Sequence, residues 1–188
     1  MKVWNLDDQQ EKYTVASVEQ EIVEVGASPD GKSGMLVATN SEVSLFNLTD
    51  GKVTSTNPVF KSHFGKAALF SPDGKLLFIP DGYQVTCHIM KSKKPPATLD
   101  LAEIPWDLAY CPKTEEVFAG GSGKIHIIDW KKETRTAVLN TGPNITGYVQ
   151  NIDVSADGRY VVAIAGPIGQ SLLIFDRQAL KGAQEKKE

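Results

Sequence analysis

Cysteines, histidine pairs and long apolar runs are all scarce in this sequence, and each shortage argues against a class of protein. Cys87 and Cys111 are the only cysteines, and neither stands at ligand spacing from another cysteine or a histidine, which argues against a zinc motif. Both lie in apolar runs, so we expect buried, reduced thiols, as in a cytoplasmic or nuclear protein. No apolar stretch approaches the roughly 20 residues that span a bilayer. The first ten residues also lack the apolar core of a secretory signal, so we expect an intracellular protein without membrane association.

Neither sign of charge dominates the sequence. Lysine and arginine together number 20 and aspartate and glutamate 23, for a net charge of -3, which makes nucleic acid an unlikely partner. The one basic cluster, Lys91, Lys93 and Lys94, stands beside Pro95 and Pro96, which is typical of a solvated loop. The composition is 41% hydrophobic and 23% charged, as in an ordinary globular protein.

The sequence does contain an internal repeat. Its clearest marker is Ser-Pro-Asp-Gly, present at 28–31 and 71–74, with weaker copies at 111–114 and 155–158. Proline fixes φ early in such a turn, and glycine accepts the positive φ that follows. The four copies stand 40 to 44 residues apart, which predicts one tight turn between antiparallel strands in each repeat.

Short apolar segments at matching positions flank each turn. The segment after the turn is the most apolar, at 35–38, 76–79, 116–119 and 160–164. A third segment, at 2–6, 43–48, 125–130 and 173–177, has Asn or Asp as its last residue but one, and a more polar fourth segment follows it. Runs of this length bounded by turn signals, without helical periodicity, predict four antiparallel strands per repeat.

The sequence resembles the WD-repeat family through Val3-Trp4-Asn5-Leu6, the two Ser-Pro-Asp-Gly turns and the period of about 40 residues. The resemblance, with degenerate repeats, implies an all-β fold: a β-propeller of four-stranded antiparallel blades, about four in this chain. The expected units are a partial blade at 1–21, blades at 22–61, 62–103 and 104–144, a partial blade at 145–177, and a polar tail at 178–188.

About four such blades leave open sheet edges, so we expect a partial or partner-completed ring. The chain is then a piece of a longer propeller, or a second copy or another subunit supplies the missing blades. Eight residues are expected to be buried between blades: Val37, Leu45, Leu77, Phe78, Val117, Ile127, Val162 and Ile174. Asp30, Asp73 and Asp157 are expected to cap the repeated turns through their side chains.

No catalytic constellation stands out. The glycine-rich segment 120–124 ends in Lys124, but Ile125 follows where a phosphate loop requires Ser or Thr at the start of a helix, so we predict a hairpin turn. His63, His88 and His126 have no partner at ligand spacing. No serine stands in a nucleophile elbow. We therefore expect no catalytic residue, cofactor or metal.

An enzymatic alternative depends on two carboxylates, Asp107 and Asp153, in the strand that would line the channel of a propeller. Lactonase-like propeller hydrolases gather such groups around a central metal ion. The matching positions of the first two repeats offer Glu24 and then Ala67 and Ala68, which interrupts the series. A structural or binding role is therefore preferred.

The favoured function is a non-catalytic scaffold that binds protein partners within a larger intracellular complex. Propellers bind partners through the loops between strands, and aromatic residues are enriched at interface hot spots. These considerations select eight candidate partner-binding residues: Asn40, Glu42, Asp81, Tyr83, Trp106, Ser122, Lys124 and Gln170.

Overall fold

The chain folds almost entirely into β-strands, as the sequence predicts. The structure is a computed structural model that describes residues 2–15, 21–40, 42–57, 68–90, 92, 94–167 and 171–179. Strands make up 56% of the described residues, and the helix assigned among them is a single turn at 177–179. Within these ranges no helix has the length and apolar character needed to cross a membrane.

Within the described residues, seventeen strands form five antiparallel sheets. In the N-terminal half the strands are β1 (Lys2–Trp4) and β2 (Glu11–Thr14), then β3 (Ile22–Ala27), β4 (Ser33–Ala38), β5 (Val43–Asn47) and β6 (Val53–Asn57), then β7 (Leu69–Phe70), β8 (Leu76–Asp81), β9 (Gln84–Ile89) and β10 (Ala97–Asp100). The C-terminal half contains β11 (Asp107–Cys111), β12 (Glu116–Gly120), β13 (Lys124–Asp129) and β14 (Thr134–Asn140), then β15 (Val149–Val154), β16 (Tyr160–Ala165) and β17 (Ser171–Asp176).

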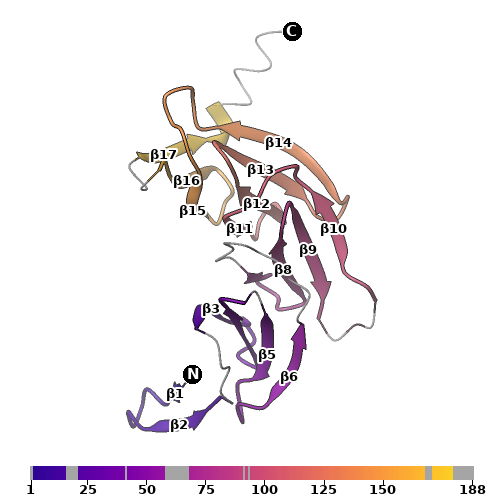
Figure 1. The fold of residues 1–188 in the computed structure, drawn as a ribbon, viewed down its shortest axis with the longest axis vertical. Helices are drawn as coiled ribbons and strands as arrows, with labels where there is room; N and C mark the ends of the chain where they lie inside the picture. Colours follow the sequence, from indigo (N-terminus) through magenta and orange to yellow (C-terminus); the bar gives the residue numbers. More distant parts are fainter. Residues whose placement is uncertain are drawn as a thin grey trace.

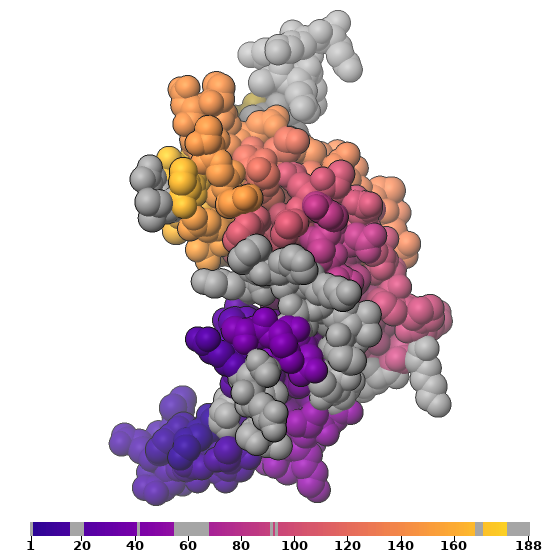
Figure 2. All heavy atoms as spheres, in the orientation of Figure 1, coloured from indigo at the N-terminus to yellow at the C-terminus, as the bar shows by residue number. Residues whose placement is uncertain are grey.

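Each sheet is a meander, in which every strand pairs with its neighbour in the sequence. Three sheets have four strands, β3–β6, β7–β10 and β11–β14, and they lie inside the units expected at 22–61, 62–103 and 104–144. The hairpin β1–β2 and the three-stranded sheet β15–β17 lie at opposite ends of the molecule (Figure 1). The sheets follow one another along its length in sequence order (Figure 2), and the described strands close into neither a barrel nor a ring.

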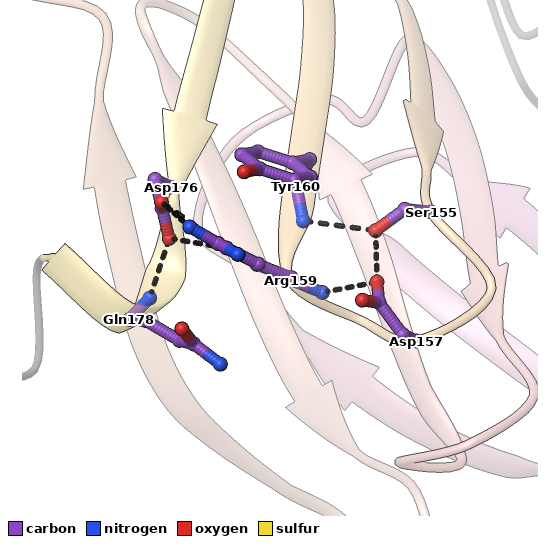
Figure 3. Close-up of polar contacts among 6 residues, drawn as sticks. All are labelled: Ser155, Asp157, Arg159, Tyr160, Asp176 and Gln178. Atoms are coloured by element: carbon purple, nitrogen blue, oxygen red, sulfur yellow. Dashed lines mark hydrogen bonds and ion pairs between the residues drawn. The ribbon is translucent and has the colours of Figure 1, made fainter.

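The predicted turns are present, and three of them have the same pattern of hydrogen bonds. In the copy that Figure 3 shows, the Ser155 hydroxyl donates to Asp157 Oδ1 at 2.6 Å and accepts the Tyr160 amide at 2.9 Å. Asp157 Oδ1 also accepts the Arg159 amide at 3.0 Å. The same three bonds form around Ser28 and Asp30 and around Ser71 and Asp73. The capping role predicted for these aspartates is confirmed.

The remaining turn, at 111–114, has the same length but a different hydrogen-bond pattern. Cys111 stands in place of serine, and its carbonyl accepts the Glu115 amide at 2.9 Å. Glu115 adopts a φ of 55°, a left-handed conformation that glycine adopts in the Ser-Pro-Asp-Gly turns. The Cys111 thiol lies 3.9 Å from the Ala156 carbonyl in the turn of the next sheet. The side chain at the first position of this turn therefore contacts the turn of the next sheet, whereas the serine of the other turns forms hydrogen bonds within its own turn.

The core consists of layers between successive sheets. The side of a sheet that points toward the next sheet in the sequence is here called its forward face, and the opposite side is called its backward face. The forward face of one sheet packs against the backward face of the next. The contacting residues, forward face first, are Met35 and Val43 with Leu77 and Ile79, Phe78 and Val85 with Val117 and Ala119, and Phe118 and Ile125 with Val161 and Ala163. The hairpin β1–β2 contributes Val3 and Tyr13 against Leu36 and Phe46 in the same manner.

This layering tests the eight predicted core residues. Five are confirmed as buried: Val37, Leu77, Phe78, Val117 and Ile127. Leu45 and Val162 are partly buried. The prediction for Ile174 is wrong, because 66% of this residue is exposed. Ile174 lies on the forward face of β15–β17, against which no other described sheet packs.

Candidate interaction surface

One end of the sheets gathers most of the candidate partner-binding residues. In a meander, the loop joining the second and third strands lies at the same end as the loop leading into the next sheet. The Ser-Pro-Asp-Gly turns occupy the opposite end, so this end carries the variable loops. We call it the loop end, defined by residues 39–40, 42, 82–83, 101–106, 121–123 and 141–148.

In the first two four-stranded sheets, the candidates lie in single hairpins. Asn40 is exposed, and its Oδ1 accepts the Glu42 amide at 3.1 Å, which orders the turn. Asp81 ends β8 and pairs with Gln84. Tyr83 is 60% exposed, while its carbonyl accepts the Leu101 amide at 2.9 Å. The backbone of Tyr83 is thus anchored by a hydrogen bond, while its ring stays at the surface.

In the third four-stranded sheet, Trp106 stacks on a tyrosine of the following loop. The ring centroids of Trp106 and Tyr148 lie 4.2 Å apart, with the rings tilted by 34°. Tyr148 remains 44% exposed, and Trp106 is partly exposed. Such a pair presents a broad apolar surface with little conformational entropy left to lose on binding.

Two further candidates surround this pair. Ser122 is exposed and forms a β-bridge with Tyr148, which fixes the two loops together. Lys124 is exposed at the start of β13. The structure therefore brings Trp106 and Ser122 together around Tyr148, and Lys124 lies two residues beyond Ser122. Asn40, Glu42, Asp81 and Tyr83 lie in other sheets. Gln170 lies outside the described residues.

A chain of polar groups centred on the buried His126 supports these loops. Glu103 accepts the Ser122 amide at 2.9 Å through Oε2, and its Oε1 contacts His126 Nε2. The other imidazole nitrogen, Nδ1, lies 3.3 Å from Nη1 of Arg135 on β14. Because a guanidinium only donates, Nδ1 must accept, so the proton of a neutral imidazole sits on Nε2 and is donated to Glu103. His126 is only 2% exposed, and this chain ties three segments of one sheet together.

Asp107 joins two sheets at the inner strands. Its Oδ2 accepts the Ile152 amide of β15 at 2.7 Å. Burial raises the pKa of Asp107 to about 6, and the negative charge of Asp153 acts in the same direction. The described residues contain no group of three or more histidine, cysteine or acidic side chains placed to hold a metal ion. Asp153 therefore lies close enough to act on Asp107 electrostatically, and Asp107 is engaged in a hydrogen bond between sheets.

Sequence reasoning missed three residues of this surface: Tyr148, Glu103 and Arg135. Tyr148 occupies no repeated position, so no pattern marks it before the loops are placed. Glu103 and Arg135 lie 23 and 9 residues from His126 and meet it only after the sheet forms. The buried His126 was the one available signal, since a histidine inside an apolar strand requires polar partners.

Comparison with known proteins gives no identification. No protein-family model matches the sequence. A search of curated proteins also finds no match.

Proposed function

We propose that this chain is a non-catalytic scaffold of the WD-repeat-like β-propeller type, which binds protein partners within a larger intracellular complex. Support for the propeller comes from four-stranded antiparallel meanders that recur every 40 residues or so and pack face to face in sequence order. Support for an intracellular location comes from Cys87 and Cys111, which are both free and buried.

The observation that carries the binding proposal is the aromatic pair at the loop end, in which Tyr148 is exposed and Trp106 is partly exposed. Its geometry is fixed by the bridge to Ser122 and by the Glu103–His126 contact beneath it. Rigid aromatic groups surrounded by polar side chains are characteristic of interface hot spots. Lys124, two residues beyond Ser122, adds an exposed cation at the start of β13, which favours a partner with an acidic or carbonyl-rich contact.

Affinity purification from cells that express the chain tests this proposal. We expect Tyr148→Ala to reduce the amount of the principal co-purifying protein by about tenfold or more, since a hot-spot residue contributes about 2 kcal/mol. Trp4→Ala is the matched control, because Trp4 is 55% exposed and lies in the distant hairpin β1–β2. Equal recovery with Tyr148→Ala and Trp4→Ala would refute binding at the loop end.

One observation favours the enzymatic alternative, a lactonase-like hydrolase with a central metal. Asp107 has a pKa raised to about 6 and lies close enough to Asp153 to sense its charge, and such perturbed carboxylates often mark active sites. Metal analysis of the purified protein, combined with an esterase and lactonase screen, separates the two functions. Bound metal together with activity that is lost in Asp107→Asn would establish the enzyme instead of the scaffold.

A further inference from the structure

Five Asp-Gly pairs occur in the sequence, and an aspartate followed by glycine is especially prone to isomerise without an enzyme. The pairs begin at Asp30, Asp50, Asp73, Asp81 and Asp157. Glycine has no Cβ, so its amide nitrogen approaches the carboxyl group of the preceding residue more easily than the amide of another residue does. Whether a given pair reacts then depends on how firmly the fold holds the amide and the carboxyl group.

In four of the five pairs, a backbone hydrogen bond holds the glycine amide. The amides of Gly31, Gly74 and Gly158 donate to the serine carbonyl that opens the same turn, at 2.9, 2.8 and 2.7 Å. The Gly51 amide donates to the Asn47 carbonyl at 2.8 Å. Each of these nitrogens must give up its bond before it can attack a carboxyl group, which slows the reaction.

The carboxylates of the same four pairs are held as well. Asp30, Asp73 and Asp157 each accept a serine hydroxyl at 2.6 Å and the main-chain amide of the second residue along, as Figure 3 shows for Asp157. Asp50 accepts the Lys52 amide at 3.1 Å. The serine hydroxyl lowers the pKa of Asp73 and of Asp157, which depletes the protonated carboxyl group, the form that loses water most easily.

The Asp81-Gly82 pair lacks both restraints. Among the described residues, no hydrogen bond or ion pair holds the Asp81 carboxyl group or the Gly82 amide. Gly82 is the first of the two residues that join β8 to β9, and its φ is 59°. A Cβ on Gly82 would meet no atom within 4 Å. Open space therefore surrounds Gly82, beside a carboxyl group that no bond fixes.

We propose that the Asp81-Gly82 pair is a modification site, at which Asp81 isomerises to isoaspartate in the folded protein. The Gly82 nitrogen bonds to Cγ of Asp81 and gives up its proton, and one carboxyl oxygen leaves as water, which closes a succinimide ring. Water then adds to either ring carbonyl. Breaking the bond from nitrogen to Cγ restores aspartate, whereas breaking the bond from nitrogen to the main-chain carbonyl carbon gives isoaspartate. The water lost is regained, so isoaspartate has the same mass as aspartate.

Isoaspartate at this position would alter one hairpin of the loop end. The main chain then runs through Cβ and Cγ, which lengthens the backbone by a methylene group and leaves a free α-carboxylate. Tyr83 follows Gly82 directly, and its carbonyl accepts the Leu101 amide at 2.9 Å, a bond that we expect the longer backbone to break. The free α-carboxylate is the group that isoaspartyl methyltransferases methylate with S-adenosylmethionine. Isomerisation here does not depend on the proposed scaffold function.

Peptide mapping after incubation of the purified full chain in heavy-oxygen water at neutral pH tests the site, because hydrolysis of a succinimide adds a heavy oxygen atom. Trypsin, used in ordinary water, cleaves after lysine and arginine and places each Asp-Gly pair in a separate peptide, at 13–32, 33–52, 67–75, 76–91 and 136–159. We expect peptide 76–91 to contain at least about tenfold more isoaspartate and heavy oxygen than any of the others, since their restraining bonds must break first.

Asp81→Glu and the unfolded chain serve as controls. Glutamate keeps the charge but would have to close a larger ring, so heavy oxygen should disappear from peptide 76–91 of this variant and stay unchanged in the other peptides. In concentrated urea the restraining bonds are lost, and we expect the five peptides to form isoaspartate at similar rates. Two outcomes in the folded chain would overturn the proposal. One is isoaspartate in peptide 76–91 at or below the level of the other peptides, and the other is none in this peptide while the unfolded chain forms it.

Discussion

At the scale of single residues, the repeated turn depends on a glycine that accepts a left-handed backbone. Gly31 and Gly158 occupy the same turn position, with φ of 67° and 71°. Their surroundings differ, because a Cβ on Gly31 would meet no atom within 4 Å, whereas a Cβ on Gly158 would lie 2.8 Å from Cys111 Sγ. Backbone strain and steric contact can therefore be separated by comparing the two positions.

We predict that Gly31→Ala lowers the free energy of unfolding by about 1 kcal/mol, the cost of a left-handed conformation alone. Gly158→Ala should cost about 1–2 kcal/mol more, because the buried thiol of Cys111 in the preceding sheet must move. Urea denaturation of both variants measures the difference. Equal losses would mean that the turn end of β15–β16 adjusts freely around the added methyl group.

The buried carboxylate of Asp107 makes stability depend on pH. Since burial raises its pKa to about 6 in the folded protein, the folded state holds a proton that an unfolded chain has already released between about pH 4 and 6. Asp107 therefore lowers stability as pH rises through this window. The penalty is complete above the folded-state pKa and absent below the unfolded-state pKa.

Asp107→Asn removes the ionisation while keeping an oxygen that can accept the Ile152 amide. We expect the variant to be more stable than the wild type by about 1–2 kcal/mol at pH 7.5, a value reduced for partial solvent access. The difference should vanish near pH 4. Urea midpoints measured from pH 4 to 7.5 provide the test, and a pH-independent difference would show that Asp107 is not desolvated as described.

At the scale of the element, the position of a strand in the stack decides what an apolar residue contributes. Leu77 is 2% exposed between the sheets β3–β6 and β7–β10, whereas Ile174 is 66% exposed on β17. Both belong to apolar strands of repeated units, so the sequence pattern predicts the same burial for the two residues.

We predict that Leu77→Ala lowers the free energy of unfolding by about 2–5 kcal/mol, because it leaves a cavity between two sheets. Ile174→Ala should change it by less than about 0.5 kcal/mol in the isolated chain. Chemical denaturation under identical conditions compares them. A large effect of Ile174→Ala would show that the forward face of β15–β17 is covered in solution.

An ion pair joins the last strand to the preceding sheet. Arg177 Nη2 lies 2.9 Å from Glu116 Oε2, with the two side chains 13% and 15% exposed. Arg177 Nη1 donates to the Gly158 carbonyl at 3.0 Å, and the guanidinium lies 5.2 Å from the Phe118 ring centroid. Removal of one partner leaves the other charge poorly solvated.

We predict that Glu116→Gln lowers the free energy of unfolding by about 1–3 kcal/mol, because Arg177 keeps its charge but loses its counterion. Arg177→Met combined with Glu116→Gln should cost less than the sum of the single changes. A double-mutant cycle measures this coupling. Strict additivity would show that the ion pair contributes nothing to the contact between the sheets.

At the scale of the whole molecule, local features were predictable and contacts between units were not. The Ser-Pro-Asp-Gly turns and the apolar strands set the strand count and the turn network, because both depend on residues close in sequence. The contact of Glu103 with His126 and the stacking of Trp106 on Tyr148 join loops that no periodic pattern relates. Burial of Ile174 depends on whether another sheet follows, which its own strand does not encode.

The linear order of the sheets also determines how the molecule opens. Each sheet packs only against its neighbours in the stack, so stability is expected to vary along the chain as it does in repeat proteins. The sheet β11–β14 is covered on both faces, and Val117, Phe118 and Ile125 are fully buried. The hairpin β1–β2 has two strands and is covered on one face.

Native-state hydrogen exchange should therefore show a gradient of protection. We expect the amides of β12 and β13 to exchange at least about a hundredfold more slowly than those of β1 and β2, because fewer contacts must break to open a terminal hairpin. Leu77→Ala should accelerate exchange in β4 and β8, which meet at that side chain, more than in β16. Uniform protection along the chain, or equal acceleration in all sheets, would mean that the molecule opens as one cooperative unit.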